Sequence, residues 1–314
     1  MPSLVIWNQA GPEATAAISA AVPGVSVVDI ERDPPRVPEP QAQVLLAVPR
    51  RDLPRARLPY VDVSWAESVQ WVHATPTGID QFPPALFHNK MATCGRGLSG
   101  SAIAEFVMAA VLGFEKRMPE IWASRGEEYP SQLGRAEGKT LGIVGFGAIG
   151  RAVAQRALPF GMSVLAARRT SSHPGLEGVR LVGLEELLSS SDHIVLAAPS
   201  TTETFNLLDR RRLALVRPGS HLVNVARGTL VDNDALVHAL DEGRLALATL
   251  DVVEPEPLPD VHPLRAHPRV RISQHISGSV QGVRECLVQL FIDNLRRFQA
   301  GQPLAGEIDT ELGY

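Results

Sequence analysis

The most informative segment of the chain is Leu141-Gly142-Ile143-Val144-Gly145-Phe146-Gly147-Ala148-Ile149-Gly150. A β-branched apolar run leads into a G-x-G-x-x-G pattern, and a helical pattern from Ala148 to Leu158 follows. The first glycine allows a tight turn, the second lets a pyrophosphate approach the backbone, and the third lets helix and strand pack closely. We therefore expect dinucleotide phosphates to bind at Gly145, Gly147, Ala148, Ile149 and Gly150. The alternative is a glycine-rich turn without a ligand.

The end of the next expected strand, Ser163 to Ala166, bears on the choice of cofactor. Arg168, Arg169 and Thr170 stand where NAD-binding versions carry an Asp or Glu for the ribose 2′-hydroxyl. A carboxylate would repel a 2′-phosphate, whereas guanidinium groups pair with it. The sequence predicts a preference for NADP(H), with NAD(H) possible. The alternative is a solvated basic loop beside an NAD site.

Apolar runs alternate with helical patterns on both sides of this segment. The expected strands are Leu4–Trp7, Val25–Asp29, Val44–Val48, Gln70–Val72, Thr140–Val144, Ser163–Ala166, His193–Ala197, His221–Val225, Ala246–Leu250 and Val270–Ser273. The expected helices are Pro12–Ala21, Ser99–Arg117, Ala148–Leu158, Leu184–Leu188, Asn233–Glu242 and Val283–Gln299. Such alternation is typical of βαβ units and a parallel sheet.

The length of 314 residues indicates about two domains. The last helix follows a complete second sheet, so we infer that it returns to the first domain. The expected fold class is α/β with two doubly wound parallel sheets. A Rossmann cofactor domain, residues 98–281, would be inserted in a discontinuous flavodoxin-like substrate domain formed by residues 1–97 and 282–314.

Composition excludes several classes of partner. Thirty basic against 34 acidic residues leave a net charge of −4, which provides no electrostatic footprint for nucleic acid or an anionic membrane. The N-terminus has no signal-peptide pattern, and the longest apolar stretch, near Ile103 to Phe114, is too short to span a membrane. The two cysteines match no disulfide or zinc pattern, so we expect a cytoplasmic protein without a metal site.

Three further segments place ionisable side chains just past the carboxyl ends of expected strands. They are Asn224-Val225-Ala226-Arg227-Gly228, Asp251-Val252-Val253-Glu254-Pro255-Glu256-Pro257 and Gln274-His275-Ile276-Ser277-Gly278. Ligands of an open α/β sheet bind at this edge. The three segments therefore predict a reactive site beside the cofactor.

Together with the glycine-rich loop, these segments resemble the D-isomer-specific 2-hydroxyacid dehydrogenases, which include glyoxylate/hydroxypyruvate reductases, D-lactate dehydrogenases and phosphoglycerate dehydrogenases. The resemblance is close from about Ser101 to Gly278. It implies that Arg227, Glu256 and His275 form the active site. In two departures from the family pattern, Gln274 replaces a usual proline and Arg265 replaces a common tryptophan.

The chemistry of a 2-oxo acid suits these three residue types. Arg227 can clamp the carboxylate with a planar fork, and His275 can donate a proton to the carbonyl oxygen while the cofactor supplies hydride. Glu256 would hydrogen-bond the other ring nitrogen, fix the tautomer and favour the imidazolium. Glu254, two residues earlier, is the alternative partner of the histidine.

The resemblance also implies contacts around the reacting centre. Asp251 would contact the nicotinamide amide, and the backbone of Thr77 and Gly78 would face the substrate carboxylate, unless that loop is an ordinary turn. Further residues expected at the cofactor are Pro199, Thr204, Ala226 and Gly278.

The sequence therefore predicts a reductase that transfers a hydride from NADPH to a small 2-oxo acid, glyoxylate or hydroxypyruvate first, to give a D-2-hydroxy acid. One alternative is an NAD-dependent D-2-hydroxyacid dehydrogenase of the phosphoglycerate kind. Another is a dinucleotide-sensing, corepressor-like binding protein. The family expectation is a homodimer, and because the sequence ends at Tyr314 we expect no regulatory domain after the second domain.

Overall fold

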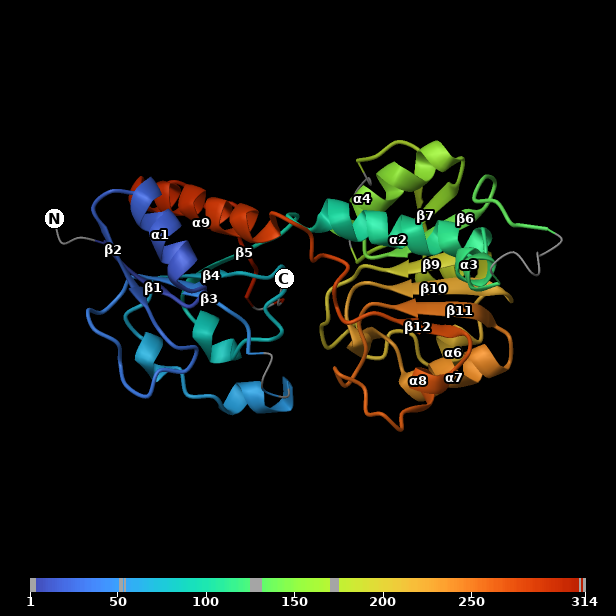
Figure 1. Cartoon of the computed structure of the whole chain (residues 1–314), viewed down its shortest axis with the longest axis horizontal. Helices are drawn as coiled ribbons and strands as arrows, with labels where there is room; N and C mark the ends of the chain where they lie inside the picture. The colour runs from blue at the N-terminus through green and yellow to red at the C-terminus, as the bar shows by residue number, and fades with distance from the viewer. Residues whose placement is uncertain are drawn as a thin grey trace. The chain divides into compact units, whose positions relative to one another are not determined.

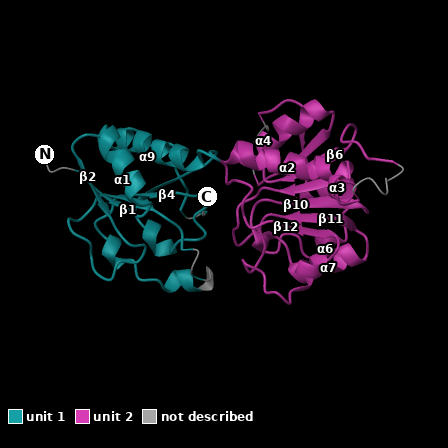
Figure 2. Ribbon diagram, in the orientation of Figure 1, with its two compact units in different colours: residues 1–98, 281–314 teal, residues 99–280 magenta. Residues whose placement is uncertain are grey.

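The structure is a computed structural model that describes residues 4–50, 53, 55–124, 132–169, 175–310 and 312. The chain divides into two compact units, Met1–Leu98 with Gln281–Tyr314, and Ser99–Val280 (Figure 2). Each unit contains one sheet whose strands all run parallel, with helices between the strands. The expected α/β fold with two parallel sheets is confirmed.

The sheet of the first unit has five strands in the order β2-β1-β3-β4-β5. Their bounds are β1 Leu4–Asn8, β2 Val25–Asp29, β3 Val44–Ala47, β4 Trp71–Ala74 and β5 Met91–Cys94. This is the strand order of flavodoxin-like sheets. The sequence did not predict β5, because a four-residue edge strand with an exposed Met91 and a polar Thr93 lacks a continuous apolar run.

Helices α1, Pro12–Ala21, and α9, Val283–Gln299, lie side by side on one face of this sheet (Figure 1). Phe291 of α9 stacks on Trp71 of β4 with ring centroids 5.3 Å apart. The opposite face is covered by two short 3-10 helices, η2 Ser64–Ala66 and η3 Pro84–Phe87, and a third, η1 Arg55–Tyr60, contacts η3. The C-terminal helix is therefore part of the core of the first unit.

The sheet of the second unit has seven strands in the order β12-β11-β10-β9-β6-β7-β8. Their bounds are β6 Thr140–Val144, β7 Ser163–Ala167, β8 Val179–Leu181, β9 His193–Leu196, β10 Ser220–Asn224, β11 Leu245–Leu250 and β12 Val270–Ile272. The order reverses between β6 and β9, as in dinucleotide-binding sheets. The sequence missed β8, since its three residues carry no distinctive period.

Helices cover both faces of the second sheet. Ile143 of β6 packs with α2, Gly100–Glu115, and α4, Ala148–Ala157, whereas Val144 points to the cluster on the other face. The face towards which Val144 points carries α5 Leu184–Ser190, α6 Arg210–Leu213, α7 Asn233–Asp241 and α8 Pro263–Ala266. The unit also contains the short helices α3 Met118–Ala123, η4 Leu158–Phe160 and η5 Gly228–Leu230. Among the described residues, no helix combines the length and hydropathy that crossing a membrane requires.

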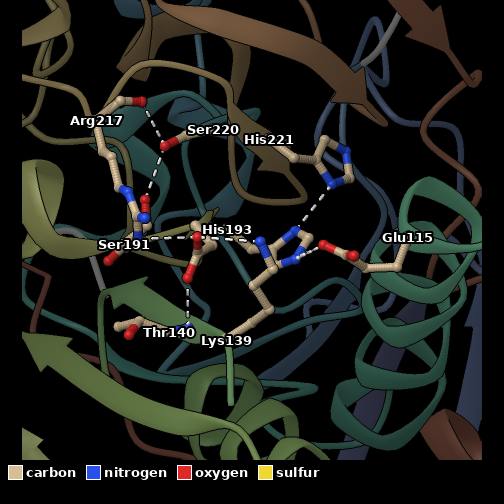
Figure 3. Close-up of polar contacts among 9 residues, drawn as sticks. Glu115, Lys139, Thr140, Ser191, His193, Arg217, Ser220 and His221 are labelled. Carbon is tan, nitrogen blue, oxygen red and sulfur yellow. Dashed lines mark hydrogen bonds and ion pairs between the residues drawn. The ribbon is translucent and has the colours of Figure 1, made fainter. Parts of the chain in front are cut away.

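A buried polar chain lies at the amino ends of β9 and β10 (Figure 3). His193 Nε2 lies 3.0 Å from Glu115 Oε1, and the Nδ1 atoms of His193 and His221 are 3.4 Å apart. His221 Nε2 reaches Thr249 Oγ1 at 2.9 Å. Burial lowers the pKa of His193 to about 4 and that of His221 to about 3, and it raises the pKa of Glu115. This cluster is at the opposite edge of the sheet from the segments expected to react, which supports a structural role for both histidines.

Candidate active site

The glycine-rich loop leaves open space at one of its three glycines. Gly145 has a φ of 94°, and a Cβ there would lie 2.5 Å from the backbone nitrogen of Ala198. A Cβ on Gly150 would collide with the carbonyl oxygen of Gly145, whereas one on Gly147 would meet no described atom within 4 Å. The loop thus packs tightly on the sheet and leaves room above Gly147, which fits a pyrophosphate at the start of α4.

The end of β7 lies beside this loop. The amide of Gly145 donates to the carbonyl of Ala167 at 2.8 Å, and Arg168 and Arg169 follow directly. Arg168 is half-buried and Arg169 is exposed, while Thr170 lies outside the described residues. Arg168 and Arg169 therefore directly follow the strand at whose end the ribose of a dinucleotide binds in this fold.

The loop after β9 is organised by one threonine. The hydroxyl of Thr204 donates to the carbonyl of Pro199 at 2.7 Å and accepts from the amide of Thr201 at 2.7 Å. Ser200 is hydrogen-bonded to Thr229 at 2.8 Å, which links this loop to the segment after β10. The residues expected at the cofactor on this side thus belong to an ordered turn next to the reversal of strand order.

The last residue of β10, Asn224, arranges the segment that carries Arg227. Its amide donates to the carbonyl of Arg227 at 2.9 Å, and its oxygen accepts from the amide of Ala226 at 3.1 Å. The half-buried Arg227 donates from Nη1 to the carbonyl of Ala226 at 2.7 Å. Gly228 packs on the backbone of Val253, with which a Cβ would collide. Asn224 is not among the site residues expected from the sequence, although a polar side chain at a buried strand end is the signal that could have revealed it.

An imidazole and a carboxylate meet at the ends of β11 and β12. Nδ1 of His275 lies 3.0 Å from Oε1 and 3.3 Å from Oε2 of Glu256. Both side chains are partly open to solvent, with exposed fractions of 24% and 33%. Glu254, the alternative partner, instead accepts a hydrogen bond from Asn233 at its backbone carbonyl. The geometry therefore favours Glu256 over Glu254 as the partner of His275.

Asp251, the first residue after β11, is buried. Burial raises its pKa, but hydrogen bonds from Ser273, Ser277 and Ile276 outweigh that effect, so the pKa is lowered overall. Asp251 therefore keeps its negative charge inside the protein. Nearby, a Cβ on Gly278 would lie 3.1 Å from Ser99 Cβ at the start of α2.

The adjacent strands β10, β11 and β12 bring Arg227, Asp251, Glu256 and His275 to one edge of the second unit's sheet. Thr77 and Gly78 belong to the other unit, where they follow β4 and Thr77 Oγ1 donates to the carbonyl of Gly95 at 3.4 Å. Within the described ranges, no three His, Cys, Asp or Glu side chains are grouped so that they could hold a metal ion.

Comparison with known proteins assigns the family. The family model for the NAD binding domain of D-isomer specific 2-hydroxyacid dehydrogenases matches residues 106–277, more than half of the chain. The chain belongs to the D-isomer specific 2-hydroxyacid dehydrogenases. The matched range contains the glycine-rich loop and the segments of Arg227, Glu256 and His275.

Relatives of this dehydrogenase family have both curated names and solved structures. A glyoxylate reductase from Thermococcus gammatolerans is 44% identical over 167 residues, 52% of this chain and 50% of that protein, so the match spans about half of the relative's length. A D-isomer specific 2-hydroxyacid dehydrogenase from Xanthobacter autotrophicus Py2, solved with NADPH and MES, has a TM-score of 0.85 at 27% identity and is covered completely, as is this chain. A D-lactate dehydrogenase from Aquifex aeolicus, complexed with NAD and lactic acid, has a TM-score of 0.78 at 25% identity, over 95% of this chain and 96% of that one.

Proposed function

We propose that the protein is a reductase that transfers a hydride from NADPH to a small 2-oxo acid, such as glyoxylate or hydroxypyruvate, and releases the D-2-hydroxy acid. The observation that carries this proposal is the contact between His275 and Glu256 beside the strand end that holds Arg227. Family membership and the name of the Thermococcus relative support a 2-oxo acid as the substrate class.

Arg227 binds the carboxylate of the substrate in this proposal. Its guanidinium is permanently charged and planar, and its two parallel N–H groups match the two oxygens of a carboxylate. Asn224 and the packing of Gly228 hold the backbone around it, and Nη1 of the guanidinium donates to the carbonyl of Ala226 at 2.7 Å, so the side chain is restrained before substrate arrives.

His275 supplies the proton in this proposal. With Nδ1–H donating to Glu256, the second ring nitrogen, Nε2, carries the proton that passes to the carbonyl oxygen of the substrate. When bound, the nicotinamide cofactor supplies the hydride for the carbonyl carbon. Glu256 attracts the protonated ring and holds its orientation, and solvent returns the proton to the partly exposed histidine after product leaves.

Turnover with different substrates tests the reaction. We expect NADPH consumption with glyoxylate or hydroxypyruvate to exceed that with bulkier 2-oxo acids, and chiral analysis should detect the D-enantiomer when hydroxypyruvate is reduced. No NADPH or NADH consumption with any 2-oxo acid in such a panel would contradict the proposal and favour a binding function.

NADPH preference is the finer part of the proposal, and it rests on Arg168 and Arg169. Two charge-assisted contacts of about 1.5 kcal/mol each correspond to a preference of at most about a hundredfold, and solvent exposure reduces it. We therefore expect kcat/KM to favour NADPH over NADH by about 10- to 100-fold. Relatives have been solved with either cofactor, so kinetics must decide.

A charge reversal tests this preference directly. Arg168→Asp should invert it, because the carboxylate repels a 2′-phosphate and accepts from a 2′-hydroxyl. Arg211→Asp is the matched control: Arg211 is exposed on α6 and pairs with Glu185 at 2.9 Å. Equal use of NADH by the wild-type protein, or the same result for both variants, would leave an NAD-dependent dehydrogenase as the better description.

We further propose that the protein acts as a homodimer, which is the expectation for its family. The two unpaired cysteines support a reducing compartment, the cytoplasm. Light scattering should give twice the chain mass for the wild-type protein. A monomeric wild-type protein would contradict this part.

A further inference from the structure

The turn that carries His275 has an unusual backbone. His275 has a φ of 55°, in the left-handed region that residues with a Cβ rarely adopt. Three successive amides in this turn donate to one residue. His275 N donates to the carbonyl oxygen of Asp251 at 2.8 Å, Ile276 N to Oδ1 at 2.9 Å and Ser277 N to Oδ2 at 3.0 Å. Asp251 therefore holds the turn in the conformation that presents the histidine.

The amides of this turn form an anion-binding concavity, and the anion is the chain's own carboxylate. Successive N–H groups around a left-handed residue commonly bind anions in this way. Asp251 is 1% exposed, so the two amides and the carboxylate meet away from bulk water. Because an unbalanced buried charge is costly, this carboxylate depends on its donors.

Ser273 also donates to this carboxylate, which accepts a further side-chain hydrogen bond from Ser277. Its hydroxyl donates to Asp251 Oδ1 at 2.6 Å, while its amide donates to the carbonyl of Leu250 at 2.9 Å. The backbone bond continues the pairing of β12 with β11, so Ser273 is held by the sheet on one side and holds Asp251 on the other. The Ser273 hydroxyl therefore connects the end of β12 to the Asp251 carboxylate, which accepts the hydrogen bonds of the turn.

From these contacts we infer that Ser273 is a positioning residue for His275, and that it acts through Asp251. The inference rests on the proposed function, since it concerns the histidine that donates the proton there. Removing the hydroxyl leaves the buried carboxylate with donors from the turn alone, namely the amides of Ile276 and Ser277 and the hydroxyl of Ser277. The carboxylate then loses the one donor that comes from β12 rather than from the turn, and the imidazole is held less firmly at hydrogen-bond distance from Glu256.

A pair of variants of equal shape separates the hydroxyl from the packing. Ser273→Thr keeps the hydroxyl, whereas Ser273→Val replaces it with a methyl group. We expect Ser273→Val to lower kcat about tenfold or more, the change typical for loss of one hydrogen bond to a charged group, and to change KM for NADPH by less than it changes kcat. Ser273→Thr should restore kcat to within about threefold of wild type. Equal kcat for the two variants would overturn the inference.

Amide hydrogen exchange provides a readout that needs no substrate. The amides of Ile276 and Ser277 should exchange at least about tenfold faster in Ser273→Val than in Ser273→Thr, while amides of α4 exchange equally in both. Equal exchange at Ile276 and Ser277 would overturn the inference. If wild-type protein reduces no 2-oxo acid, the proposed function fails, and the exchange comparison still decides whether Ser273 anchors the turn.

Discussion

Nδ1 of His275 lies 3.0 Å from Oε1 of Glu256, and the two residues are 19 positions apart in the chain. The first follows β12 and the second follows β11, which are adjacent in the sheet. A carboxylate at Nδ1 leaves Nε2 as the ring nitrogen that exchanges a proton with a substrate. In the proposed reaction, this contact therefore makes Nε2 the ring nitrogen that donates the proton to the substrate.

Replacing the acid itself should remove most of the activity. We expect His275→Ala to lower kcat by about 10²- to 10⁴-fold, the range for a positioned acid or base, with little change in the Kd of NADPH. Steady-state kinetics and NADPH fluorescence measure the two quantities. His88→Ala, at an exposed position in the first unit, is the control. Turnover near the wild-type rate would remove His275 from the mechanism.

The two neighbouring glutamates should differ in their effect. Glu256→Gln keeps a hydrogen-bonding side chain but loses the charge that attracts the protonated ring, so kcat should fall by up to about tenfold, since the pair is partly solvated. Glu254→Gln should leave kcat within about twofold. A larger loss in the Glu254 variant would mean that the partner of the histidine is wrongly assigned.

Arg227 should not tolerate lysine. Arg227→Lys preserves the positive charge and loses the bidentate geometry. The expected result is at least a tenfold lower kcat/KM for 2-oxo acids, since a hydrogen bond between charged groups contributes about 1.5–3 kcal/mol. Initial rates over a range of substrate concentrations measure this. Equal kcat/KM for the two proteins would show that only the charge matters.

Gly228 should be sensitive to a single methyl group. In Gly228→Ala the new Cβ would collide with the backbone of Val253, in the segment that leads to Glu256. We expect a loss of about 1–3 kcal/mol in unfolding free energy and a lower kcat. Gly113→Ala on α2, where a Cβ meets no described atom within 4 Å, should leave both unchanged or raise stability. Denaturant titration should separate the two variants.

The buried histidines should make unfolding pH-dependent. Burial, with a smaller effect of His193, lowers the pKa of His221 to about 3, so the unfolded chain binds the proton first as pH falls below about 6.5. The contribution of His221 to the free energy of unfolding is therefore complete above about pH 6.5. It falls as the pH is lowered, and at pH 5 the free energy of unfolding has decreased by about 2 kcal/mol. The raised pKa of Glu115 acts in the opposite direction, since its proton stabilises the folded state at low pH.

A non-titrating side chain isolates this effect. His221→Gln keeps donors and acceptors near Thr249 and cannot take up a proton in this range. In urea titrations, the wild-type protein should lose about 2 kcal/mol more than the variant between pH 8 and pH 5. Equal losses would mean that His221 does not titrate with unfolding.

Local sequence patterns alone predicted the α/β architecture and the glycine-rich cofactor loop. The spacing of Gly145, Gly147 and Gly150 and the alternation of apolar runs with helices are properties of contiguous residues, so they predicted the α/β class without any knowledge of packing. The edge strand β5 and the three-residue strand β8 were not predicted. Strands this short form by pairing with a neighbouring strand, and their own residues show no clear hydrophobic period.

Tertiary structure decided which distant side chains touch. From the residues alone, Glu254 and Glu256 were both candidate partners for His275, and the family spacing was needed to choose between them. In the structure, the order and register of β10, β11 and β12 bring Glu256 to the imidazole ring. The bond from Ser273 to Asp251 and the left-handed backbone of His275 have no sequence signal at all. Hydrogen bonds between separate strand ends depend on how the strands are ordered and aligned in space, and periodicity along the chain does not encode that arrangement.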